Sequence, residues 1–188
     1  MLKNGGSILT GKMNYLKLDR EFTIKQYSRG NLQREYGIDS PLGFRGMRYY
    51  DVNVDADIYE AIPDCDVDEC KVSLLDINYK IPPHSDDVRL VINFYLNTTK
   101  CITQFYYPSD FHASDAGDVI FYEPNLEKED RFMAYSGDAY LLNVSTPHAI
   151  LPFEPGPVNR KCISVTLPYD DFEQAAEVLK STGCFADD

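Results

Sequence analysis

The chain has 188 residues, of which 44% are hydrophobic and 13% aromatic. This length and composition are typical of one folded domain with a sizeable core, and they exclude a disordered segment or a miniprotein held together by disulfides. The chain carries 18 basic and 30 acidic side chains, so its formal net charge is −12. Such a charge disfavours nucleic acid and anionic membranes as partners.

The chain lacks an apolar run of the roughly 20 residues that cross a bilayer, and its start lacks the apolar centre of a signal peptide. The five cysteines are odd in number and scattered, which is typical of free thiols in a reducing compartment. We therefore expect a cytoplasmic protein without a membrane partner. Cys65 and Cys70 lie in an acidic loop that could hold a metal, but no second Cys/His pair is near.

The sequence predicts a single domain over residues 1–188. Residues 1–70 mix short apolar clusters with glycine and charge, and we expect an N-terminal extension of short helices and edge strands. Residues 45–51 carry two cations and two aromatic rings, which could contact an anionic or planar substrate or form a solvated loop.

From residue 71 to 168, short runs rich in Val, Ile, Tyr and Phe are bounded by Pro, Gly, Asn or Asp, which is typical of β-strands. Seven strands without a helical pattern between them indicate an antiparallel sandwich or barrel. The predicted strands are Val72–Tyr79, Val88–Asn97, Ile102–Tyr106, Asp118–Tyr122, Arg131–Tyr135, Ala139–Val144 and Lys161–Leu167.

Residues 169–188 form the last segment, a C-terminal helix and tail. Between Asp170 and Ser181 the apolar residues fall on one helical face, an Asp is available as N-cap, and Gly183 follows as a stop. This amphipathic helix is expected to cover the outside of a sheet.

Two predicted strands alternate between an apolar and a polar face. In residues 90–97 the polar face carries Asn93 and Tyr95, and in residues 159–167 it carries Arg160, Cys162 and Ser164. The apolar faces should pack under a helix. A buried Arg160 would cost several kcal/mol without an anion, so we expect it to bind a carboxylate, either a ligand's or that of a structural salt bridge.

Three side chains could form a metal site. His84 and Asp86 stand two apart at the start of a strand and can project to one side, and His148 follows the strand Ala139–Val144. Two His and one carboxylate on one face of an ion form the triad of non-haem Fe(II) oxygenases. The alternative is that His84 caps a loop and Asp86 accepts a turn hydrogen bond; His112 is expected in an exposed loop.

The second half of the chain resembles the 2-oxoglutarate- and Fe(II)-dependent dioxygenases, particularly their prolyl-hydroxylase-like branch. The matching pieces span roughly residues 72–168 in the family's order: His84-Ser85-Asp86, Asn93-Phe94-Tyr95-Leu96-Asn97, Thr103-Gln104-Phe105, Gly137-Asp138-Ala139, His148 and Arg160.

The resemblance implies a mainly β double-stranded β-helix, a jelly-roll or cupin-like barrel. It implies Fe(II) held by His84, Asp86 and His148, with 2-oxoglutarate as cosubstrate and Arg160 on its distal carboxylate. Tyr95 and Thr103 would line the same pocket, together with Asn93 and Ser164 from the polar strand faces. The reaction would consume O2 and hydroxylate a small molecule or a protein side chain.

Two departures separate this chain from the family pattern. Cys162 stands where a hydroxyl often follows the Arg by two residues, with Ser164 four after it, and Lys100-Cys101-Ile102 replaces a Gly-Gly before Thr103. Two alternatives to the dioxygenase follow: an inactive jelly-roll binding or assembly module, and a cupin-like metal enzyme without 2-oxoglutarate. Because ligation requires neutral imidazoles, metal binding should weaken as the pH falls towards ~6.5. The oligomeric state is not readable.

Overall fold

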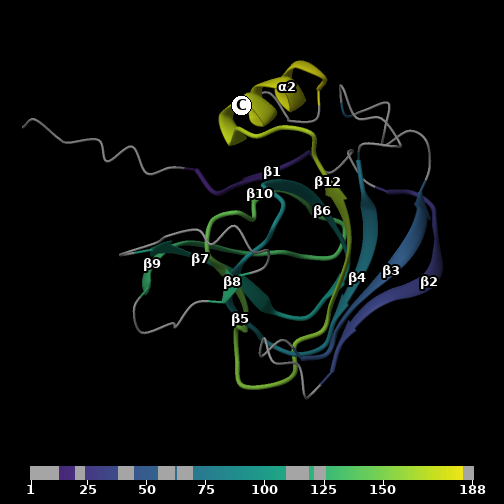
Figure 1. Ribbon diagram of the computed structural model, residues 1–188, viewed down its shortest axis with the longest axis vertical. Coiled ribbons are helices and arrows are strands. Elements are labelled where there is room, and N and C mark those ends of the chain that lie inside the picture. The colour runs from purple at the N-terminus through teal and green to yellow at the C-terminus, as the bar shows by residue number, and fades with distance from the viewer. Residues whose placement is uncertain are drawn as a thin grey trace, which may run out of the picture.

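The computed structural model describes residues 13–19, 24–37, 45–54, 62, 70–108, 119–120 and 126–183. These residues form two antiparallel β-sheets that face each other, with one helix outside them (Figure 1). The large sheet has the order β1-β10-β6-β12-β4-β3-β2, and the small sheet has the order β8-β5-β11-β7-β9.

The bounds of the elements are as follows. The large sheet contains β1 (Tyr15–Lys17), β2 (Tyr27–Tyr36), β3 (Met47–Val54), β4 (Val72–Ile77), β6 (Leu90–Thr98), β10 (Ala139–Asn143) and β12 (Arg160–Thr166). The small sheet contains β5 (Ile81–Ser85), β7 (Cys101–Pro108), β8 (Val119–Ile120), β9 (Leu126–Met133) and β11 (His148–Pro152). The helix is α2 (Phe172–Ser181).

The strand order is that of a jelly roll. From β4 to β7 the chain changes sheet at every step, and it does so again from β10 to β12. As a result β10, β6, β12 and β4 lie side by side in one sheet, opposite β5, β11, β7 and β9 in the other. This arrangement is a double-stranded β-helix, as predicted.

Each of the seven predicted strands overlaps a strand of the structure, but β5 and β11 were not predicted as strands. Pro82 and Pro83 lack the backbone N–H that a strand interior normally needs, so their presence argued against β5. In β11 the sequence His-Ala-Ile-Leu-Pro is short and does not alternate. The structure also corrects the loop interpretation of residues 45–51, because β3 begins at Met47 and pairs with both β2 and β4.

The predicted helix is confirmed. The Asp171 side chain caps it by accepting a hydrogen bond from the backbone N–H of Gln174, and Gly183 follows with φ 75°. The helix covers the outer face of the large sheet. Its buried residues Phe172, Ala175, Ala176 and Leu179 share one apolar cluster with Ile92, Phe94, Leu141, Ile163 and Val165.

The space between the sheets holds two further apolar clusters. One is aromatic and includes Phe132 and Tyr140, whose ring centroids lie 4.2 Å apart. The other includes Met47, Ile77 and Ile150. The polar residues singled out in the sequence lie between these two clusters, in the interior of the barrel.

Two further observations bear on the expectations from composition. In the described part of the chain, no helix is long and apolar enough to span a membrane. Cys101 and Cys162 are free and buried, but Cys70 takes part in a disulfide, so the expectation of free thiols is wrong for Cys70. Cys65 lies outside the described residues, as do residues 1–12 and 184–188.

Candidate metal and anion site

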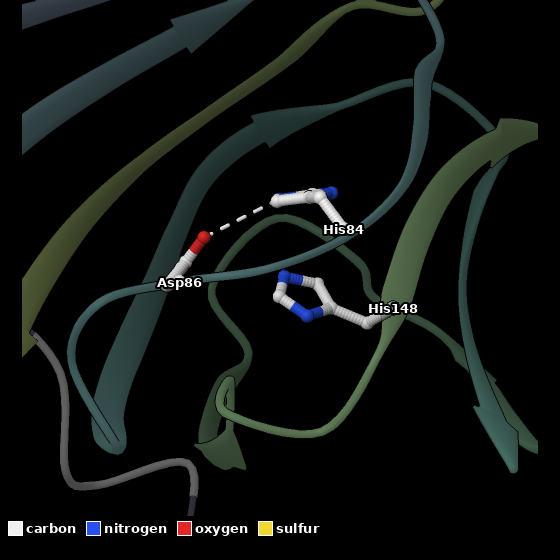
Figure 2. A group of neighbouring side chains, drawn as sticks. All are labelled: His84, Asp86 and His148. Atoms are coloured by element: carbon white, nitrogen blue, oxygen red, sulfur yellow. Dashed lines mark ion pairs between the residues drawn. The ribbon is translucent and has the colours of Figure 1, made fainter. Parts of the chain in front are cut away.

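The side chains of His84, Asp86 and His148 lie close together (Figure 2). His84 in β5 pairs directly with His148 in β11, which places the two imidazoles side by side with ring centroids 4.3 Å apart. Asp86 follows β5, and its backbone N–H donates to the Val144 carbonyl over 3.0 Å. The potential ligand atoms of the three residues all lie within 4.8 Å of one another.

Backbone carbonyls orient both imidazole rings. His84 Nδ1 lies 2.8 Å from the Pro82 oxygen, and His148 Nδ1 lies 3.0 Å from the Thr146 oxygen. These contacts assign the proton to Nδ1 in each ring and leave the Nε2 lone pair available, which is how metal-binding histidines are commonly held. His84 Nε2 lies 3.4 Å from Asp86 Oδ1. The three residues can therefore hold a divalent metal.

Both imidazoles are neutral at pH 7. Burial lowers the pKa of His84 to about 4, and burial together with the neighbouring His84 lowers the pKa of His148 to about 4. Since neutral imidazole is the form that binds a metal, little proton release should accompany binding at neutral pH. Metal binding was expected from the sequence to weaken as the pH falls towards ~6.5. With these lower pKa values, the weakening is expected at a lower pH.

An inner cavity joins this triad to the other predicted residues. Its volume is about 50 Å³. Its lining brings together all eight side chains proposed from the sequence: His84, Asp86, Asn93, Tyr95, Thr103, His148, Arg160 and Ser164.

Arg160 is a buried cation in this cavity, with only 2% of its surface exposed. Its Nη1 donates to Thr103 Oγ1 over 2.8 Å, its Nε to Cys101 Sγ over 3.2 Å, and its Nη2 to the Cys101 carbonyl over 3.3 Å. The guanidinium carbon lies 5.2 Å from the centre of the Tyr95 ring. Among the described residues no carboxylate lies within 4.0 Å of the guanidinium, so the structural salt bridge considered from the sequence is not seen there.

Two buried polar atoms of the same cavity, the Tyr95 hydroxyl and Asn93 Oδ1, lack a well-formed hydrogen bond. Burial, opposed first by the charge of Arg160 and then by the nearby Asn93 and Thr103 side chains, raises the pKa of Tyr95 to about 12, so the hydroxyl keeps its proton and can donate. Because buried polar groups are nearly always paired, such atoms in one cavity with a cation that has no carboxylate partner indicate a binding site.

The two departures from the family pattern lie on the cavity or beside it. Cys162 faces the cavity, and burial, with a smaller opposing effect of Arg160, raises the pKa of its thiol to about 12. The group is therefore a neutral thiol at pH 7. Ser164 faces the same cavity, so a hydroxyl is present one pleat further along β12.

Two sets of cavity residues were not predicted from the sequence. Cys101, which supplies two of the three hydrogen bonds of Arg160, was noted only as part of an altered loop. Met47 and Tyr49 of β3 also line the cavity, and their segment was interpreted as a loop. The alternation of polar and apolar residues over 51–54 was a usable signal for a strand, but its pairing with β4 was not readable.

No protein-family model and no curated protein matches the chain. Solved structures that resemble it include the hydroquinone 1,2-dioxygenase PnpCD (TM-score 0.39, 11% identity, covering 54% of this chain and 60% of that one). Another is vicilin from Corylus avellana, with a TM-score of 0.36 and 16% identity, covering 63% of this chain and 29% of that one. A third is oxalate decarboxylase from Bacillus subtilis, with a TM-score of 0.34 and 13% identity, covering 68% of this chain and 29% of that one. The chain thus covers less than two thirds of each. Likeness at this level carries no argument about function, and the fold assignment rests on the strand order.

Proposed function

We propose that the chain is an Fe(II)- and 2-oxoglutarate-dependent dioxygenase that hydroxylates a small molecule or a protein side chain. The observation that carries this proposal is the buried Arg160, which has no carboxylate partner in the described part of the chain and shares one cavity with His84, Asp86 and His148. A cation and a metal site in one cavity suit a ligand that chelates at one end and carries a carboxylate at the other.

The hydrogen-bonding capacity of Arg160 supports a bound carboxylate. A guanidinium offers five N–H donors, and the three contacts of Arg160 leave two of them for a ligand. The buried Tyr95 hydroxyl, which makes no well-formed hydrogen bond, adds a third donor nearby. In the proposed complex, Arg160 and Tyr95 donate to the distal carboxylate of 2-oxoglutarate, and Thr103 holds Arg160 in position.

The sheet register supports the required spacing. His148 pairs with Phe105, and Ile150 pairs with Thr103. Thr103 thus stands two residues from the level of His148, or about 7 Å along the strand. A five-carbon diacid can run between an ion at His148 and a guanidinium at Thr103. The chelating end of the diacid would lie at His84, Asp86 and His148, which line the same cavity as Arg160.

In this proposal His84, Asp86 and His148 hold the iron and leave its remaining positions open. The bound iron and 2-oxoglutarate supply an oxidant from O2, with release of succinate and CO2. The protein orients the cosubstrate through Arg160 and Tyr95. The apolar clusters on either side of the cavity exclude water from the reacting atoms.

The proposal is tested by titrating the Mn(II)-loaded protein with diacids of different lengths and by assaying succinate formation with Fe(II), ascorbate and 2-oxoglutarate. We expect 2-oxoglutarate to bind in preference to oxalate and oxaloacetate, and succinate to form. Metal binding without 2-oxoglutarate binding or turnover would overturn the proposal in favour of a cupin-like metal enzyme. Absence of metal binding would favour an inactive module.

A further inference from the structure

A wider outer cavity opens beside the inner one. Its volume is about 320 Å³, and it shares five lining residues with the inner cavity: Tyr49, Leu75, Asp86, Val91 and Ser164. His84 and His148 are buried, whereas the Asp86 side chain is 28% exposed. A molecule in the outer cavity therefore approaches the candidate metal site past Asp86.

A row of polar side chains leads from the outer cavity to the inner one. Ser73 in β4 is paired with Ser164 in β12, and Ser164 is paired with Asn93 in β6. The row ends at Asn93 Oδ1, the buried acceptor without a hydrogen bond. An apolar ligand would cover this row without offering it a hydrogen-bond partner, which is costly. The row indicates a polar ligand that carries N–H or O–H donors.

The wall of the outer cavity carries charges of both signs. Arg34 and Lys71 are the cations, and Asp51 and Asp87 are carboxylates besides Asp86. Among the described residues, Lys71, Asp51 and Asp87 make no ion pair within 4.0 Å; Asp51 accepts a hydrogen bond from the neutral Gln33 side chain.

This charge pattern limits the ligand. The carboxylates of the wall and the net charge of −12 disfavour a ligand with several negative charges, such as a phosphate, whereas Lys71 can pair with a single carboxylate. A small molecule with one ammonium and one carboxylate group satisfies both kinds of wall residue. The volume is also in keeping with a small ligand rather than with a folded partner.

We propose that the outer cavity binds a free amino acid and that this amino acid is the substrate. Asp51 and Asp87 hold its ammonium group, Lys71 holds its carboxylate, and its side chain extends towards Asp86. The role as substrate rests on the proposed function. Hydroxylation would place one oxygen atom of O2 into a C–H bond of the side chain, while the other enters succinate as 2-oxoglutarate loses CO2.

The binding step is tested on the metal-free 188-residue chain, by saturation-transfer NMR and calorimetry with the standard L-amino acids. We expect at least one to bind, and we expect its N-acetyl and methyl ester derivatives to bind roughly tenfold more weakly or worse, because each lacks one charge. Binding of none of them, or equal binding of the derivatives, would overturn the inference. Preferential binding of the N-acetyl amide would overturn it in favour of a peptide substrate.

Matched variants locate the bound amino acid. Asp51→Asn and Lys71→Gln should each raise its Kd roughly tenfold. Glu177→Gln and Lys180→Gln, which remove the same charges from the exposed face of α2, should leave the Kd unchanged. Equal Kd values in all four variants would overturn the placement in this cavity. The thermal unfolding midpoint of each variant checks that it is folded.

The two proposals fail in different ways. Amino-acid binding is measured without iron or 2-oxoglutarate, so binding combined with no 2-oxoglutarate turnover would overturn the proposed function and leave an amino-acid site. Turnover of 2-oxoglutarate combined with no amino-acid binding would overturn the inference alone.

Discussion

Arg160 in β12 donates a hydrogen bond to Thr103 in β7 over 2.8 Å, although 57 residues separate them and they belong to opposite sheets. The bond ties the sheets together inside the barrel and fixes the guanidinium in the inner cavity. No anion takes part in this bond, so the charge of Arg160 is stabilised there by the dipole of a neutral hydroxyl. This makes Arg160 the residue whose replacement best separates cosubstrate binding from metal binding.

The first prediction concerns Arg160. Arg160→Ala should retain Mn(II) binding and weaken 2-oxoglutarate binding by ~100-fold or more, because each hydrogen bond to a charged group contributes about 1.5–3 kcal/mol. Calorimetry measures both affinities. Arg160→Lys keeps the charge but loses the two-pronged geometry, so it should bind with intermediate affinity.

The neighbouring Lys161 supplies the control for Arg160. It points to the other face of β12, where its Nζ lies 3.8 Å from Asp76 Oδ2. Lys161→Ala should leave 2-oxoglutarate affinity unchanged. If Arg160→Ala bound 2-oxoglutarate as tightly as the wild type does, the assignment of the carboxylate site would be wrong.

The second prediction concerns His148. His148→Ala removes one of three ligands and should weaken Co(II) or Mn(II) binding by more than the ~10–100-fold that loss of a supporting residue costs. Equilibrium dialysis with metal analysis measures the change. His112→Ala removes the chain's third histidine and should have no effect. Equal metal content in wild type and His148→Ala would contradict the triad.

Strand alternation explains why much of the site could be predicted. The period of two in β6 and β12 separates a helix-facing side from an interior side, so it placed Asn93, Tyr95 and Arg160 on interior faces. The same pattern identified the face that α2 covers. These inferences needed only the direction of successive side chains, which local sequence fixes.

Contacts that depend on register between distant strands could not be predicted. Cys101 contacts Arg160 because β7 and β12 face each other across the barrel, and local sequence does not encode that. The outer cavity needs β2 and β3 beside β4, a pairing that brings Asp51 near residues of the later strands. His84 was expected at the start of a strand, but it lies near the end of β5, whose prolines concealed the strand.

The third prediction concerns the pH dependence of stability in the metal-free protein. The folded pKa values of His84 and His148 are about 4, below the unfolded value of ~6.5, so between these values the unfolded state binds more protons. Stability should therefore be full above pH ~6.5 and decline as the pH falls towards 4. Besides burial, the neighbouring His84 and Arg160 lower the pKa of His148, and the Asp86 carboxylate raises it.

Urea denaturation at a series of pH values measures this decline. At about 1.4 kcal/mol per pKa unit, the two imidazoles should together contribute a loss on the order of a few kcal/mol. The double variant His84→Asn/His148→Asn should show a shallower decline between pH 6.5 and 4. An identical slope in the double variant would show that other groups cause the acid sensitivity.

The fourth prediction separates the core from the site. Leu179 in α2 is fully buried on the outer face of the large sheet, on the opposite side of that sheet from the cavity. Leu179→Ala should lower the free energy of unfolding by about 2–5 kcal/mol through the lost contacts and the space left behind. Lys180→Ala, at an exposed position on the same helix, should change it by less than about 0.5 kcal/mol.

Because Leu179 shares no contact with the triad, the Kd for Mn(II) should stay at the wild-type value in both variants. A weaker Mn(II) affinity in Leu179→Ala alone would mean that the helix positions the site through the sheet.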